Sequence, residues 1–248
     1  MILPILVAGL LIGSFLNVVV SRVPEGRSLW RPRSACPACG ALIVWHDNVP
    51  LVSFLALRGR CRACGIRIPW RYPIVEAATG VLFAAAYVAF GPTAEFMVAA
   101  LFLALLIAIT AIDLERHIIP DLLSIPGTVA GLIANLATGR LPVTDSILGI
   151  VIGGGLFLAI ILVRPDGMGG GDMKLGALLG AFLGWKIALL SIFVAVTLGG
   201  AVAAVLMAAG LRGRKDAIPF GPFLAAGGAA GLFCGEGVIR WYLGGFAG

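Results

Sequence analysis

The chain has 248 residues, of which 60% are hydrophobic and 12% are charged, and its mean hydropathy is +1.06. A soluble domain of this size carries about 25% charged residues, so this composition excludes an ordinary soluble protein and indicates a membrane protein. For a membrane protein, the net charge of +6 raises the question of where the basic residues lie relative to the bilayer.

Apolar runs predict about eight membrane-spanning helices, because one span needs about 20 apolar residues. The first is expected at residues 3–20, and we expect it to be retained because it lacks a basic start and a cleavage site before Arg22. The next four are expected at 73–90, 94–112, 121–137 and 146–163. A run from 173 to 210 is too long for one helix, so we divide it at Gly184-Trp185-Lys186, and a last span lies between 218 and 243.

Eight spans place both chain ends on one side of the membrane. The links at residues 21–72, 113–120, 164–171 and 211–217 then share the other side, and they hold 14 of the 18 Lys and Arg residues. Because basic residues accumulate on the cytoplasmic side, we expect these links in the cytoplasm and both ends outside it. The expected organisation is a helix at 1–20, a basic cytoplasmic loop at 21–72 and a membrane-embedded domain at 73–248 with about seven helices.

Two C-x-x-C pairs lie inside the basic loop, Cys36 with Cys39 and Cys61 with Cys64. Cytoplasmic thiols stay reduced, so four thiolates predict a structural zinc site of tetrahedral geometry. A glycine follows each pair and permits the tight turn that such a site needs. A metal-free loop and a zinc ribbon that binds nucleic acid are the alternatives. Topology and contact with membrane lipids already account for the arginines, so no nucleic-acid partner is expected.

Three aspartates lie at the ends of predicted spans, where an acidic side chain is costly. Asp113 closes the third span, where its charge opposes the helix dipole, so helix stability does not explain it. Asp172 opens the sixth span after Gly169-Gly170-Gly171, and Asp121 opens the fourth; capping of the helix is the alternative for Asp172 and the favoured interpretation for Asp121. Asp113 and Asp172 can share a proton, so one serves as a base towards water and the other as an acid towards a peptide carbonyl.

Other polar and small residues have two interpretations each. Asn17 and Glu76 lie just inside the first and second spans, where they form interhelical hydrogen bonds or part of a substrate site. Lys174 either orients Asp172 or reaches the lipid headgroups. Gly153-Gly154-Gly155 lies inside a span and predicts close helix packing.

Seven stretches of the sequence resemble the prepilin peptidases, the type IV leader peptidases of the glycine-x-glycine-aspartate class. Together with the two cysteine pairs, these stretches are residues 9–18, 47–51, 57–61, 71–76, 112–113 followed by 119–121, 169–175 and 218–224. They occur in order over nearly the whole chain, so the resemblance is specific.

This resemblance implies an all-α enzyme of the bacterial inner membrane whose catalytic residues are Asp113 and Asp172. It implies that the enzyme removes a short basic leader from prepilins and pseudopilins at the cytoplasmic face. Because the cysteine loop is complete, it also implies N-methylation of the new N-terminus with S-adenosylmethionine. The supporting candidates are Gly169, Gly171, Lys174, Asp121, Glu76 and Asn17.

Two other classes of protein stay open from the residues alone. In a transporter the aspartates would bind ions or protons, although such sites usually lie near the bilayer midplane and these lie at helix ends. In a binding module the cysteine loop would recruit a cytoplasmic partner, and the membrane part would only anchor it. A cleavage assay on aspartate variants separates both classes from a peptidase.

Overall fold

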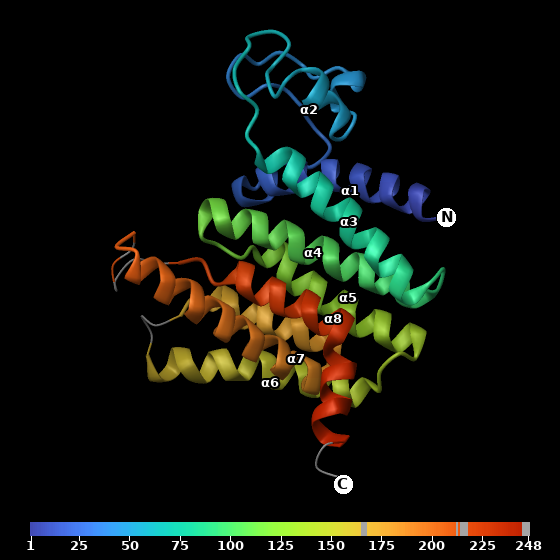
Figure 1. Cartoon of the computed structure of the whole chain (residues 1–248), viewed down its shortest axis with the longest axis vertical. Helices are drawn as coiled ribbons and strands as arrows, with labels where there is room; N and C mark the ends of the chain where they lie inside the picture. Colours follow the sequence, from blue (N-terminus) through green and yellow to red (C-terminus); the bar gives the residue numbers. More distant parts are fainter. Residues whose placement is uncertain (165–167, 212, 214–217, 245–248) are drawn as a thin grey trace. The chain divides into compact units, whose positions relative to one another are not determined.

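The computed structural model describes residues 1–164, 168–211, 213 and 218–244, except for the side chain at 243. As the sequence predicts, the regular structure of these residues is helical (Figure 1). The long helices are α1 (Ile2–Arg22), α3 (Arg71–Phe90), α4 (Ala94–Arg116), α5 (Asp121–Thr138), α6 (Val143–Val163), α7 (Gly170–Ala208) and α8 (Gly221–Gly244). The loop between α1 and α3 carries the short helix α2 (Val52–Ala56) and 3-10 turns at Val23–Glu25 and Trp45–Asn48.

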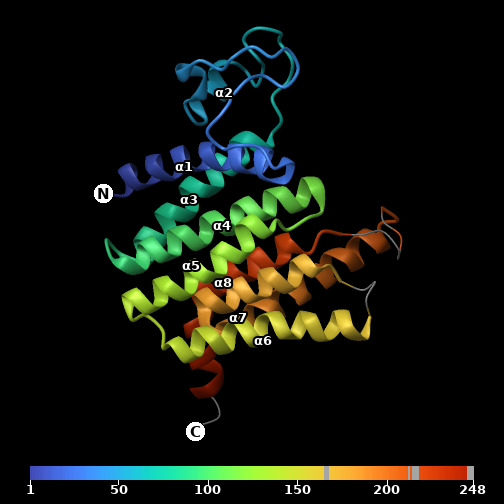
Figure 2. The ribbon, with the colours of Figure 1, turned by 180° about the vertical axis from the view of Figure 1, so that it is seen from behind.

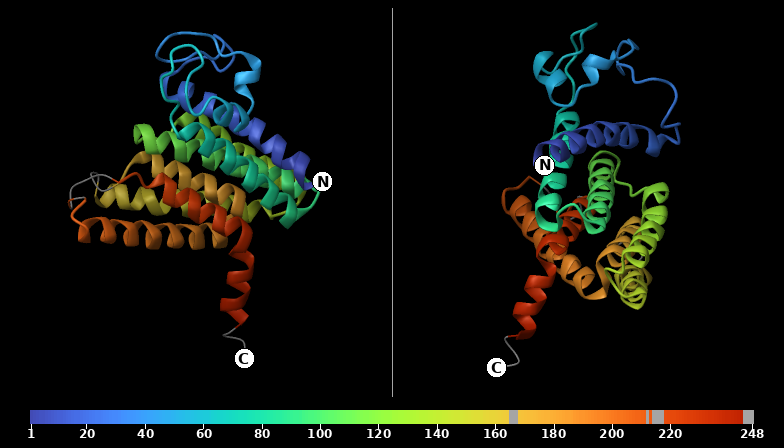
Figure 3. Two further views of the ribbon diagram at one scale, coloured as in Figure 1. Left: turned by 45° about the horizontal axis from the view of Figure 1, so that its top comes forward. Right: turned by 90° about the vertical axis from the view of Figure 1, so that its right-hand side faces the viewer.

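Seven of the described helices are long and apolar enough to cross a membrane. One of them, α7, has 39 residues and is interrupted at Gly184, whose φ of 74° and ψ of 169° do not belong to a helix. Figure 3 shows that the part of α7 after Gly184 runs back alongside the part before it. If α7 is counted as two segments, the seven long helices described here give eight segments. The break falls at the position that the sequence predicts. Glycine suits the position because a side chain disfavours positive φ.

The carbonyl groups freed by the break in α7 are bound by a buried amide. Asn135 of α5 is fully buried, and its Nδ2 donates to the carbonyl oxygens of Ala181 at 2.8 Å and Phe182 at 3.2 Å. Arg140 adds a hydrogen bond of 3.3 Å from Nη1 to the carbonyl of Phe182. A helix end that is buried inside the protein needs such donors, because no water reaches its last carbonyls.

The chain divides into two compact units, Met1–Phe96 and Met97–Gly248. In the first unit α1 and α3 lie side by side, and the cysteine loop joins them (Figure 1). Glycines set their spacing: a Cβ atom on Gly13 would lie 2.7 Å from the Cα of Glu76, and one on Gly9 would lie 2.8 Å from the Cα of Gly80. The backbones of the two helices are therefore in direct contact, as small residues allow in membranes.

In the second unit α6 packs closely against α7 (Figure 2). A Cβ atom on Gly153 would lie 2.3 Å from the carbonyl oxygen of Gly176, and one on Gly154 would lie 3.2 Å from the Cβ of Ala177. The predicted packing role is therefore confirmed for Gly153 and Gly154. The predicted packing role is wrong for Gly155, because a Cβ atom built on this residue would have no other atom within 4 Å.

The outward faces of the helices are strongly apolar. Leu122 on α5, Val151 on α6 and Phe193 on α7 are exposed by 66%, 62% and 68%. In water such faces would form large apolar patches, whereas in a bilayer they are the surface that meets the lipid tails.

Candidate active site and metal centre

Asp113 lies in the last turn of α4. The helix continues to Arg116, so it extends four residues past the predicted end of the span at 112. The side chain of Asp113 is buried, and its Oδ2 accepts a hydrogen bond of 2.9 Å from the backbone N–H of Gly221, the first residue of α8. A Cβ atom on Gly221 would lie 2.6 Å from that oxygen, so only glycine lets the N–H come this close. Sequence reasoning did not assign this role to Gly221, although it lies in one of the matching stretches.

Asp172 is the third residue of α7 and lies near Asp113. The two carboxyl groups are close enough to interact electrostatically, so the structure brings this predicted pair together. The carboxylate of Asp172 is hydrogen-bonded to the backbone N–H of Gly169, but Asp172 is not the N-cap residue, because Gly169 occupies that position. In addition, the backbone N–H of Asp172 donates to the carbonyl of Gly169 at 3.1 Å.

The two glycines before Asp172 have different surroundings. A Cβ atom on Gly171 would lie 2.9 Å from the Cβ of Ile119, so this glycine makes room for the segment that leads into α5. A Cβ atom on Gly169 would meet nothing closer than the Asp172 carboxylate at 3.7 Å. Gly169 therefore leaves space beside the carboxyl group of Asp172. Gly171 allows the start of α7 to pack against Ile119 in the link between α4 and α5.

Asp121 was expected to cap α5, and this expectation is wrong. Pro120 holds the N-cap position in an extended conformation, and Asp121 is the first helical residue without a side-chain capping bond. Its carboxylate instead binds the ammonium group of Lys174 from α7. Lys174, expected to orient Asp172 or to reach the headgroups, therefore joins the starts of α5 and α7 beside the aspartate pair.

The four predicted metal ligands form one cluster. The sulfur atoms of Cys36, Cys39, Cys61 and Cys64 all lie within 4.8 Å of one another. Each cysteine pair is followed by its own turn, and the two turns have the same hydrogen bond. The N–H of Gly40 donates to the carbonyl of Cys36, and the N–H of Gly65 donates to the carbonyl of Cys61, each at 2.9 Å. The φ angles of these glycines are 71° and 69°, which explains why glycine follows each pair.

The pKa is lowered for the Cys36 thiol and raised for the Cys64 thiol. Backbone N–H groups of Cys39 and Ala38 lower the pKa of the Cys36 thiol to about 7, so this thiol readily gives the thiolate that binds metal. Between the cysteine pairs, Asp47 makes two hydrogen bonds of 2.6 and 2.8 Å to the guanidinium of Arg62, which lower the pKa of its carboxyl group. The ion pair links the two halves of the loop at its surface, and four adjacent thiols fit a metal ion.

Asn17 and Glu76 bind backbone groups of the first unit. The Nδ2 of Asn17 donates to the carbonyl of Tyr72 on α3 at 3.1 Å, so the expected interhelical hydrogen bond is confirmed for Asn17. The carboxylate of Glu76 accepts a hydrogen bond from Ser14 of α1, so the interhelical hydrogen bond is confirmed for Glu76 as well, and its Oε2 accepts the backbone N–H of Leu51 at 2.9 Å. Glu76 thus links α3 to the cysteine loop, a contact that the sequence did not predict.

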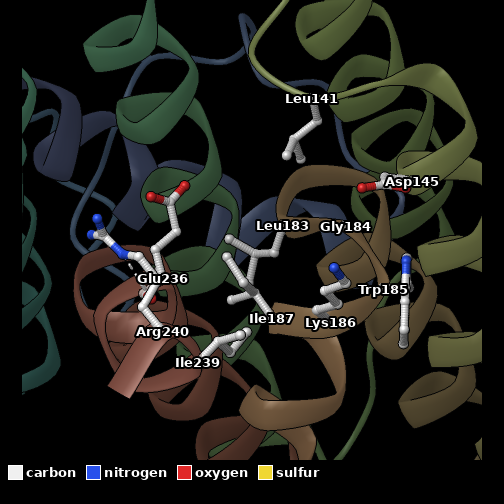
Figure 4. Close-up of a pocket in the computed structure, with 10 residues that line it drawn as sticks. All are labelled: Leu141, Asp145, Leu183, Gly184, Trp185, Lys186, Ile187, Glu236, Ile239 and Arg240. Carbon is white, nitrogen blue, oxygen red and sulfur yellow. Dashed lines mark hydrogen bonds between the residues drawn. The ribbon is translucent and has the colours of Figure 1, made fainter. Parts of the chain in front are cut away.

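A cavity of about 290 Å³ lies at the opposite end of the first half of α7 (Figure 4). Gly184 lies 12 residues after Asp172, so about 18 Å of helix separates the cavity from the aspartate pair. Charged side chains of both signs and apolar side chains line it: Leu141, Asp145, Leu183, Trp185, Lys186, Ile187, Glu236, Ile239 and Arg240. The cavity is therefore distinct from the candidate active site.

The fold and the site define a multi-pass membrane protein with a pair of neighbouring aspartates at helix ends and a four-cysteine cluster in a loop. The chain belongs to the type IV leader peptidase family. Residues 7–90 match the bacterial peptidase A24 N-terminal domain, and residues 100–204 match the type IV leader peptidase family itself.

Several proteins named prepilin leader peptidase/N-methyltransferase are similar to this chain. The protein from Burkholderia pseudomallei is 42% identical over 93% of this chain and 84% of its own length. The protein from Aeromonas salmonicida is 36% identical over 94% of this chain and 91% of its own length. The protein from Myxococcus xanthus is 42% identical over 81% of this chain, but the match spans only 61% of its own length. No solved structure matches the chain.

Proposed function

We propose that this chain is a prepilin leader peptidase and N-methyltransferase of the bacterial inner membrane. It removes the short basic leader of prepilins and pseudopilins and then methylates the new N-terminal amine. The observation that carries this proposal is the pair of carboxyl groups from Asp113 and Asp172, which come from the end of one helix and the start of another. Membership of the family and the names of its similar members support the same activity.

Cleavage of the leader follows from a proton shared between the two carboxyl groups. The ionised carboxylate takes a proton from water as the water attacks the scissile carbonyl, and the protonated partner gives its proton towards the carbonyl oxygen. Oδ2 of Asp113 is already bound to the N–H of Gly221, which fixes the orientation of that carboxyl group. The open space beside Gly169 is where we place the substrate backbone.

The cysteine cluster supports methylation through the structure of the loop. Four sulfur ligands favour zinc, and Cys36, Cys39, Cys61 and Cys64 would hold it as a structural ion. S-adenosylmethionine supplies the methyl group when it is bound. The basic loop and the aspartate pair face the cytoplasm in this proposal, because 14 of the 18 basic residues lie in the links on that side.

The test is co-expression of the chain with a prepilin-like substrate, with the product measured by mass. We expect a shortened, methylated product from the wild type, and no shortened product from Asp113→Asn or Asp172→Asn. Asparagine keeps the size and can still accept the N–H of Gly221, so these variants should fold while losing proton transfer, which is worth about 10²–10⁴ in rate.

Asp121→Asn is the matched control for this test. It removes an exposed ion pair with Lys174, and such pairs contribute about 0–1 kcal/mol, so we expect most of the activity to remain. A folded Asp113→Asn enzyme that cleaves at the wild-type rate would exclude the aspartate pair. A folded but inactive Asp121→Asn enzyme would show that the wrong carboxyl group is paired with Asp172.

A further inference from the structure

Two buried polar side chains lie in the seam between α1 and α3. Asn17 is 3% exposed and Glu76 is 8% exposed. Glu76 lies five residues after the start of α3 at Arg71, and Asn17 lies five residues before the end of α1 at Arg22. At 1.5 Å per residue, both lie about 8 Å inside the helix ends that carry the cysteine loop.

The two side chains enter the same stretch of this seam. Gly13 lies against Glu76, because a Cβ atom on Gly13 would be 2.7 Å from the Cα of Glu76. One turn further along α1, Asn17 binds the carbonyl of Tyr72, which is one turn before Glu76 on α3.

Asn17 and Glu76 bring acceptor atoms into this seam, and the guanidinium of Arg71 at the start of α3 also lies between the two helices, where it donates to Ser21 at 3.0 Å. Nδ2 of Asn17 is used on the carbonyls of Tyr72 and Gly13, whereas its buried Oδ1 receives no hydrogen bond from any described residue. The carboxylate of Glu76 accepts the N–H of Leu51 and a hydrogen bond from Ser14, although a carboxylate has about four acceptor positions. Within the described part of the chain, Glu76 makes no ion pair. Buried acceptors without donors are costly, so the seam fits a ligand with several charged N–H donors.

We infer that Glu76 and Asn17 bind the N-terminal amine of the cleaved substrate, and that Glu76 takes its proton before methylation. The inference rests on the proposed function and deepens it. A primary ammonium group has three N–H donors, enough for the free Oδ1 of Asn17 and for the Glu76 carboxylate. In the proposed topology, α1 and α3 present the seam at the membrane face where cleavage leaves the new N-terminus.

The chemistry of methyl transfer needs such a proton acceptor. The ammonium group first gives one proton to the carboxylate of Glu76, which leaves a neutral amine with a free electron pair. That pair attacks the methyl carbon of the sulfonium methyl donor, the carbon–sulfur bond breaks, and its electrons stay on the sulfur. The positive charge thus moves from sulfur to the methylated nitrogen, and Glu76 later releases its proton to solvent. A placed general base contributes about 10²–10⁴ in rate.

The deciding variant is Glu76→Gln in the full-length protein. Glutamine keeps the size and keeps a carbonyl oxygen that can accept the N–H of Leu51, but it cannot take a proton. We expect unchanged metal content and leader cleavage, together with a loss of methylation of roughly 100-fold or more. The second readout is binding: the wild type should prefer a synthetic apolar peptide with a free N-terminal amine over the same peptide acetylated, and Glu76→Gln should lose this preference.

Two further variants make the result decisive. Glu95→Gln removes an exposed acid from the start of α4 in the same unit and should match the wild type in every readout. Glu76→Asp keeps the charge and should recover part of the methylation and of the amine preference.

Three outcomes would overturn the inference or separate it from the proposed function. A folded Glu76→Gln protein that methylates at the wild-type rate and still prefers the free amine excludes the site. Joint loss of metal, cleavage and methylation in Glu76→Gln shows that Glu76 only anchors the loop, and the inference is then wrong. A wild type that cleaves but never methylates refutes the methyltransferase part of the proposed function; the amine preference then decides the site by itself.

Discussion

The seam between α6 and α7 leads to a prediction that distinguishes two glycines of one helix. Gly153→Ala places a Cβ atom 2.3 Å from the carbonyl oxygen of Gly176, whereas ordinary contact begins at 3.4 Å. The obstacle is the backbone of a neighbouring helix, so the two helices must move apart by about 1 Å. Forcing extra atoms into a packed interior costs about 1–3 kcal/mol, and a rigid obstacle places this case near 3 kcal/mol.

Helix propensity offsets part of that cost, since alanine is favoured over glycine by about 1 kcal/mol in a helix. The net loss for Gly153→Ala is therefore about 2 kcal/mol. Gly155→Ala gains the same propensity without any contact, because nothing lies within 4 Å of its Cβ position. In a chain of this size each kcal/mol shifts the Tm by about 2–4 °C, so we expect a fall of about 4–8 °C for the first variant and a rise of about 2–4 °C for the second.

Thermal unfolding of the purified protein in detergent measures both shifts, and leader cleavage adds a functional readout. Asp172 lies one helical turn before Gly176, so displacement of α7 should also slow cleavage in Gly153→Ala. Equal melting temperatures for the two variants would contradict the close approach of the helices at this seam.

Four further predictions concern the loop, the topology and the break in α7. Purified protein should contain about one zinc ion per chain, and Cys36→Ser or Cys61→Ser should remove it; metal analysis of protein prepared without chelators checks this. Folded loop variants of this kind should accumulate cleaved but unmethylated product, and equal loss of both activities would count against separate sites. Reporter fusions should place the loop in the cytoplasm and the C-terminus outside it. Asn135→Leu should lower the Tm, because it removes the Asn135 donor from the buried carbonyl of Ala181, at a cost of about 1–3 kcal/mol, and leaves the carbonyl of Phe182 with Arg140 alone.

The helices and their interruptions follow from local properties of the sequence. Apolar length predicts the spans, and the run from 173 to 210 exceeds what one span can hold, so a break at Gly184 is the simplest division. The cysteine cluster is equally local, because the ligand type and the two-residue spacing within each pair determine the fold of each turn.

Contacts between helices were harder to predict, because they depend on packing that no local pattern encodes. Aspartate is a residue type favoured at N-cap positions, but Pro120 is the N-cap of α5. The carboxylate of Asp121 therefore binds Lys174 on α7. From the sequence, Asn135 is an ordinary polar residue in a span. Its binding partners are carbonyls at the break in α7, some 50 residues later in the chain, which no local pattern indicates. The link from Gly221 to Asp113 likewise joins residues 108 positions apart in the chain.

The hydrogen bond from Gly221 makes the two oxygens of Asp113 chemically different from each other. Oδ2 accepts a hydrogen bond from an N–H that can only donate, so a proton on this carboxyl group is more stable on Oδ1. In the proposed cleavage reaction, the oxygen that binds Gly221 therefore fixes the carboxyl group to the scaffold, and the other oxygen exchanges protons. In that proposed reaction, the peptide bond and its attacking water approach Asp113 from the side of Oδ1, and the start of α8 determines which side that is.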